Sequence, residues 1–176
     1  MRKMKRRDLE HLIRAAGAIA EASELVILGS QAILGRYPEA PEELLVSQEA
    51  DLYPLRAPGQ ADLIDGSIGE LSPFHEQFGY YAHGVGPETA MLPRHWQERL
   101  IPVANENTGG VAGLCLHPAD LAISKLLAGR EKDIAYVSAL LKHGLASEQE
   151  IRQLFSELSQ EQAERVDREL KRCRRG

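Results

Sequence analysis

The chain has 176 residues, of which 43% are hydrophobic and 27% charged, and its formal net charge is -5 at pH 7. This length favours one domain whose core needs no disulfide or structural metal, and the negative charge excludes a global attraction to nucleic acid or to anionic membranes. Cys115 and Cys173 match neither a disulfide framework nor a metal-binding spacing. No apolar run reaches the length of a membrane span, so we expect a cytoplasmic protein.

The first residues predict a helix, a strand, a tight turn and a short helix. Asp8 can cap an amphipathic helix over residues 9–19, where apolar side chains recur at helical spacing. The apolar run 25–28 predicts a buried strand that enters a turn at Gly29-Ser30, followed by a short helix over residues 31–36. Such a turn has two interpretations. It is either a purely structural turn or a phosphate-binding turn, in which N–H groups, a hydroxyl and a helix N-terminus point at a phosphate.

A second strand is predicted over residues 49–55, with Pro54 near its end or at a sheet edge. Side chains two residues apart on a strand point to the same face, so Glu49 and Asp51 should lie side by side. Adjacent carboxylates raise the cost of ionising each other. A divalent cation relieves that conflict, and Mg²⁺ prefers oxygen ligands shared with substrate phosphates. The pair therefore predicts either a magnesium site or an ordinary solvated strand face.

The middle of the chain predicts a helix over residues 62–71 and a strand over 78–85. Beyond a Gly-Pro turn, residues 89–92 predict a return strand, residues 101–103 another short strand, and residues 105–113 a loop rich in Asn and Gly.

The last third is helical. Pro118 can open a helix over residues 119–143 that stops at Gly144. Ser147 and Glu150 form a capping-box pattern for a final helix that reaches about residue 172. The order of elements predicts an α+β (α/β) fold, a mixed sheet flanked by helices with a helical C-terminal extension. We expect residues 1–115 to form the core and residues 116–176 a helical part packed on it.

Helical spacing over residues 119–143 places Arg130 inside an apolar stripe that includes Leu126 and Ile134. A buried arginine needs an anionic partner, which Asp133 or an external carboxylate can supply. Lys125, Lys132 and Tyr136 share a different face, which is either solvated or directed at a ligand.

The order of a strand, a Gly-Ser turn, a short helix and a strand with an acid-x-acid pair resembles the nucleotidyltransferase superfamily. More closely, the chain looks like small bacterial nucleotidyltransferase-like families related to the toxins of abortive-infection toxin–antitoxin pairs. The more distinctive part of the resemblance consists of three segments: Leu116-His117-Pro118-Ala119-Asp120-Leu121, Ser124-Lys125-Leu126 and Ala128-Gly129-Arg130-Glu131-Lys132-Asp133.

The resemblance implies a role for each matching residue. Gly29 and Ser30 would hold nucleotide phosphates, and Glu49 and Asp51 would hold Mg²⁺ and take part in catalysis. Lys125 would be a catalytic residue that reaches a phosphate or the acidic centre. The remaining nucleotide-binding residues would be Arg130, Lys132 and Asp133.

Two departures from the family pattern matter. Glu49 stands where an aspartate is usual, and the later strand offers His83 where many active members have a third carboxylate, often the base for the attacking hydroxyl. Two functions therefore stay open. The first is Mg²⁺-dependent transfer of a nucleotidyl group from a nucleoside triphosphate to a hydroxyl of RNA, protein or a small molecule. The second is a catalytically degenerate relative that binds a nucleotide or a protein partner, for instance in a toxin–antitoxin-like system.

Aromatic and histidine side chains near the later strand have plain structural interpretations as well. His83 is a base, a metal-adjacent group or a hydrogen-bonded structural histidine. Tyr80 and Tyr81 either stack a base or pack. Trp96 is expected to anchor a loop or short helix, and Asn105 to shape a turn.

Overall fold

In a computed structural model that describes residues 3–175, five strands form one mixed sheet in the order β3-β2-β1-β5-β4. β1 pairs with β2 in antiparallel and with β5 in parallel orientation, β2 with β3 in parallel, and β4 with β5 in antiparallel orientation. The strands are β1 (Glu24–Leu28), β2 (Glu49–Pro54), β3 (Tyr81–Gly84), β4 (Ile101–Val103) and β5 (Ala112–Cys115).

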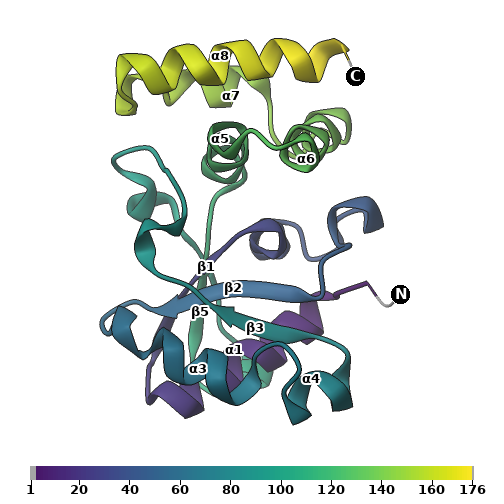
Figure 1. The fold of residues 1–176 in the computed structure, drawn as a ribbon, viewed down its shortest axis with the longest axis vertical. Helices are drawn as coiled ribbons and strands as arrows, with labels where there is room; N and C mark the ends of the chain where they lie inside the picture. Colours follow the sequence, from purple (N-terminus) through teal and green to yellow (C-terminus); the bar gives the residue numbers. More distant parts are fainter. Residues whose placement is uncertain (1–2, 176) are drawn as a thin grey trace.

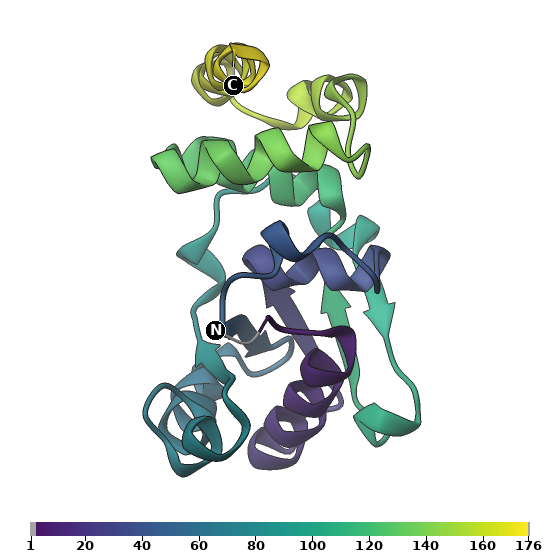
Figure 2. The same cartoon turned by 90° about the vertical axis from the view of Figure 1, so that its right-hand side faces the viewer.

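Figure 1 shows helices at both ends of the molecule, with the sheet between them. α1 (Arg6–Ala20), α3 (Ala61–Ile68) and α4 (Pro73–Phe78) lie at the lower end of the view, and the short α2 (Ile33–Arg36) lies between the sheet and α5. α5 (Pro118–Ala128), α6 (Glu131–Lys142), α7 (Glu148–Gln153) and α8 (Gln160–Arg175) stack at the upper end. Figure 2 shows α8 outermost, above α5 and α6.

One face of the sheet packs against α1, α2 and α3. A Cβ at Gly113 of β5 would meet Ile13 of α1, and Cys115 lies against Gly35 of α2. Strand alternation and the register Leu28↔Asp51 and Asp51↔His83 put the side chains of these last two residues on the opposite face. The candidate polar residues of β2 and β3 are thus kept apart from the apolar face that binds the helices.

The predicted fold class is confirmed: the chain folds as a mixed sheet flanked by helices, followed by a helical C-terminal part. The apolar run of β1 is buried as expected, β2 forms where alternation predicts it, and β4 forms at the predicted short strand. Across residues 3–175, the helices include none that combines the length and apolar character needed to cross a membrane.

The single helix predicted over residues 119–143 is wrong, because the chain breaks between α5 and α6. Gly129 adopts a left-handed backbone with φ 71° and ends α5. Arg130 then begins a new helix as its N-cap, and its N–H donates to the Asp133 carboxylate at 3.2 Å. The helix predicted from Ser147 to residue 172 is likewise two helices. Its capping box at Ser147 is confirmed, but Ser159 and Gln162 form a second box that starts α8.

Four smaller predictions also need correction. Residues 89–92 form no return strand, because Pro87–Thr89 is a 3-10 turn followed by a loop. The loop expected over residues 105–113 ends early, since β5 begins at Ala112. The N-cap of α1 is Lys5, and Asp8 instead accepts the Lys5 N–H from within the first turn at 2.9 Å. The helix expected over residues 62–71 ends at Ile68, and α4 follows as a separate helix that starts at Pro73.

Candidate functional site

The turn after β1 brings its backbone directly against Asp51. Gly29 has φ 70° and ψ -172°, a region that side chains other than glycine avoid. A Cβ at Gly29 would lie 2.5 Å from Oδ2 of Asp51. The glycine thus serves two purposes, since it permits the turn and leaves room for the carboxylate.

Replacing Gly29 with alanine should therefore lower the free energy of unfolding by about 1–3 kcal/mol and displace Asp51. Gly79→Ala is the matched control, because Gly79 also has a positive φ, of 82°, but a Cβ there meets nothing within 4 Å. That control should carry backbone strain alone, about 1 kcal/mol. Urea denaturation of both variants measures the difference, and equal losses at the two positions would contradict the close approach.

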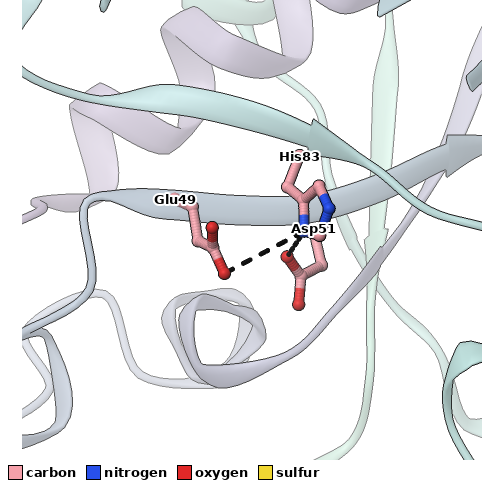
Figure 3. A group of neighbouring side chains, drawn as sticks. All are labelled: Glu49, Asp51 and His83. Carbon is pink, nitrogen blue, oxygen red and sulfur yellow. Dashed lines mark hydrogen bonds and ion pairs between the residues drawn. The ribbon is translucent and has the colours of Figure 1, made fainter. Parts of the chain in front are cut away.

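Glu49, Asp51 and His83 form one cluster on β2 and β3, on the sheet face opposite α1 and α3 (Figure 3). Nδ1 of His83 lies 3.1 Å from Oδ1 of Asp51 and 4.0 Å from Oε1 of Glu49. Burial, and secondarily the charge of Glu49, raises the pKa of Asp51, whereas His83 opposes that shift. Ionisation of Asp51 is thus energetically unfavourable in the folded protein, and a bound cation would lower that cost.

Tyr81, which precedes His83 on the same face of β3, orients the first carboxylate. Its hydroxyl donates to Oε2 of Glu49 at 2.9 Å, and burial together with this bond raises the pKa of Tyr81. Tyr80 points elsewhere and packs against Phe74 and Phe78, with its hydroxyl 2.7 Å from Nδ1 of His11. The packing interpretation is therefore confirmed for Tyr80, while Tyr81 belongs to the polar cluster.

Lys125 of α5 reaches the turn from the other side. Its Nζ donates to Oγ of Ser30 at 2.8 Å and lies 4.9 Å from the ring centre of Tyr136. Tyr136 of α6 in turn donates its hydroxyl to the backbone oxygen of Ser30 at 2.6 Å. The lysine side chain is only 14% exposed, and burial lowers its pKa, opposed by the charges of Asp133 and Asp51. The expectation of a simply solvated lysine face does not hold for Lys125.

The break between α5 and α6 places the start of α6 beside Lys125. Oδ1 of Asp133 lies 3.7 Å from Nζ of Lys125. In an unbroken helix, their separation of eight positions in the sequence would place their backbones about 12 Å apart along the axis. Asp133 is almost fully buried, with 1% of its side chain exposed. The Asp133 carboxylate therefore offsets the positive charge of Lys125, while the Ser30 hydroxyl accepts a hydrogen bond from the same ammonium group.

Arg130 is not the buried arginine that helical spacing predicts. Its side chain is 60% exposed, because the new helix that begins at this residue removes it from the apolar stripe of α5. The predicted partner is confirmed: Nε of Arg130 donates to Oδ2 of Asp133 at 2.7 Å. Arg130 and the exposed Lys132 both face the cleft.

These side chains line one cleft of about 610 Å³ between the sheet and α6. Its lining includes the two carboxylates and His83 from β2 and β3, and the cations Lys125, Arg130 and Lys132 from α5 and the start of α6. The predicted site residues that line it are Ser30, Glu49, Asp51, Lys125, Arg130, Lys132 and Asp133. Gly29 underlies the cleft through its contact with Asp51. The arrangement offers carboxylates for a metal ion and cations for phosphates.

The donor set fits a divalent cation. One ligand atom each from Glu49, Asp51 and His83 lies within 4.8 Å of the others, a spacing that one ion can bridge. The three side chains point toward a common space in Figure 3. A cation there would also offset the unfavourable ionisation of Asp51.

The sequence does not reveal the roles of two residues. Tyr136 fixes the Ser30 turn. Arg99 holds the loop before β4 to the C-terminal helices. Tyr136 carries a weak signal, because it shares the helical face of Lys132. Arg99 carries none, because both of its partners are distant in the sequence. His83 was visible in the sequence, but its register with Asp51 was not.

Residues 7–172 match the sequence profile of a family described as "Nucleotidyltransferase of unknown function (DUF6036)". The chain belongs to this nucleotidyltransferase family. The resemblance to the nucleotidyltransferase superfamily is thereby confirmed, while the relation to abortive-infection toxins stays a prediction. The chain has no significant match among curated proteins or among solved structures.

Proposed function

We propose that this protein transfers a nucleotidyl group from a nucleoside triphosphate to a hydroxyl acceptor with the help of a divalent cation. The observation that carries the proposal is that a single cleft brings carboxylates and cations together. Glu49 and Asp51 of β2 line it, and so does Lys125 of α5, hydrogen-bonded to Ser30. Membership of a nucleotidyltransferase family supports a triphosphate as the substrate.

The reaction would join the acceptor oxygen to the α-phosphorus, break the bond to the departing pyrophosphate and release the hydroxyl proton to solvent. A divalent cation, Mg²⁺ in the resemblance, supplies neutralisation of the phosphate charge when it is bound. Lys125 would bind a phosphate oxygen and hold the triphosphate along the cleft. Because α2 is a single turn, most of the positive charge near Ser30 comes from Lys125. Lys132 and Arg130 would attract the anionic ligand at the cleft mouth.

The proposal is tested by binding first and transfer second. Each of the four triphosphates is titrated with Mg²⁺ or Mn²⁺, and transfer of α-phosphate label is then followed to RNA, to proteins including the chain itself, and to small hydroxyl compounds. Wild-type protein should bind at least one triphosphate and label at least one acceptor class. Absence of any triphosphate binding, identical in wild-type protein and in Asp51→Asn, would refute the proposal.

Lys125→Met should weaken binding of the triphosphate roughly tenfold or more, because a charge-assisted hydrogen bond to phosphate is lost. Lys142→Met is the matched control, since Lys142 is an exposed lysine on α6 outside the cleft lining. Calorimetric titration of both variants gives the affinities. If both substitutions have the same small effect, Lys125 is not the phosphate-binding residue.

A non-catalytic relative is the second candidate, and one observation favours it. His83, rather than a carboxylate, faces Asp51 at the position where many active members carry their third acid. Binding of a triphosphate without label transfer to any acceptor class would support this candidate. In that case the protein would act as a nucleotide sensor or as the partner-binding component of a toxin–antitoxin-like pair.

A further inference from the structure

The strand register makes an imidazole the third member of the candidate metal cluster. β2 and β3 run parallel, and Asp51 pairs directly with His83. Both side chains therefore lie on the same sheet face at the same level, with Glu49 two residues earlier on that face. Nδ1 of His83 is close to both carboxylates, at 3.1 Å from Asp51 and 4.0 Å from Glu49.

The orientation of His83 suits metal ligation. In Figure 3 the ring lies beside the carboxylate of Asp51, with one nitrogen directed to the carboxylate oxygens. Its side chain is 49% exposed, so small adjustments of the ring meet little resistance from packing. The hydroxyl of Tyr81 meanwhile holds Glu49 by its other oxygen, which leaves Oε1 directed toward His83. Such outer hydrogen bonds fix the direction of a ligating carboxylate.

The ligand chemistry differs from that of an all-carboxylate site. Mg²⁺ takes oxygen ligands and depends on their negative charge, whereas imidazole nitrogen is a good ligand for first-row transition ions. A neutral imidazole in place of a third carboxylate removes one negative charge and adds one nitrogen donor. The lost charge lowers the affinity for every divalent cation, whereas the nitrogen donor favours a transition ion over Mg²⁺.

We propose that Glu49, Asp51 and His83 form a two-carboxylate, one-imidazole centre that selects a first-row divalent transition ion, Mn²⁺ as the representative, over Mg²⁺. This inference rests on the proposed function, because it names the ion that nucleotidyl transfer would employ. It replaces the Mg²⁺ that the family resemblance implies with an ion chosen by this chain's own ligands.

The test measures metal binding without nucleotide. Mn²⁺ and Mg²⁺ are titrated separately into wild-type protein and into His83→Asp, which restores an all-oxygen ligand set. Because most sites bind Mn²⁺ more tightly than Mg²⁺, the informative quantity is the ratio of the two affinities. That ratio should fall roughly tenfold or more in His83→Asp, the size of change typical for altered metal-site ligation. The matched control is His95→Asp, since His95 is an exposed histidine outside the cluster, and it should keep the wild-type ratio.

A spectroscopic measurement reports the ligand itself. Pulsed electron paramagnetic resonance of bound Mn²⁺ should show coupling to an imidazole nitrogen in wild-type protein and in His95→Asp, and no such coupling in His83→Asp. Thermal unfolding of each variant verifies that it is folded. An unchanged affinity ratio in His83→Asp, or no nitrogen coupling in wild-type protein, would overturn the inference.

The two proposals fail in different ways. If label transfer depends on Asp51 but the Mn²⁺/Mg²⁺ ratio is insensitive to His83, the proposed function stands and the metal preference falls. If Mn²⁺ binds with nitrogen coupling but no triphosphate binds, the metal preference stands and the proposed function falls.

Discussion

Replacing Arg99 with alanine is expected to lower the free energy of unfolding by about 3–5 kcal/mol. The guanidinium of Arg99 forms a two-bond pair with Asp120, at 2.9 and 2.8 Å, and another with Glu157, at 2.9 Å for both bonds. Asp120 lies in the first turn of α5 with 0% of its side chain exposed. Without Arg99 its charge would be buried and uncompensated, which is the costly outcome for a broken buried ion pair.

Urea denaturation measures this loss, with Arg94→Ala as the matched control. Arg94 lies in the same loop but is exposed, and its guanidinium donates a single bond to the backbone oxygen of Ser156. The control should lose about 1 kcal/mol or less. Adding Asp120→Asn to Arg99→Ala should recover part of the stability, because the unpaired charge is then removed. A loss under about 1 kcal/mol in Arg99→Ala would show that Arg99 does not tie the loop to the helices.

Asp51→Asn is expected to reduce the proposed nucleotidyl transfer at least about 100-fold, the scale for removing one group that stabilises charge in a reaction centre. Its free energy of unfolding at pH 7 should not fall. The raised pKa of Asp51 means that the folded protein holds this carboxyl ionised at a cost, which a neutral amide of the same shape avoids. The variant therefore separates function from stability.

Transfer of label and urea denaturation are measured together on this variant. Asp62→Asn is the matched control, since Asp62 is exposed on α3 and lies outside the cleft lining, and it should change neither quantity. Loss of stability in Asp51→Asn comparable to the loss in Arg99→Ala would indicate a structural carboxylate. Retained transfer would remove Asp51 from the reaction centre.

Local patterns were sufficient for the elements that position the two carboxylates. The apolar run of β1, the glycine turn and the alternation in β2 each occupy a few consecutive residues, so the sequence alone predicts them. The helix break was harder to predict, because apolar residues lie on both sides of Gly129 and periodicity alone favours one helix. A left-handed glycine and the capping pair of Arg130 and Asp133 outweigh that periodicity.

Long-range pairing explains what the sequence did not reveal. β5 has only four residues, one of them Gly113, and it becomes a strand because β1 and β4 pair with it on both sides. Arg99 meets partners 21 and 58 residues away, so no local pattern predicts their contact. The proximity of His83 to Asp51 likewise depends on parallel pairing between strands 32 residues apart.

The confinement of Lys125 has a consequence for the energetics of ligand capture. A lysine side chain that is free in solution loses about 2 kcal/mol of rotamer entropy when it becomes immobilised. In this fold, much of that loss accompanies folding itself, because the Ser30 hydroxyl, the Tyr136 ring and Asp133 already restrict the side chain. An incoming anion would therefore meet a preorganised ammonium group, and more of its interaction energy would remain as affinity.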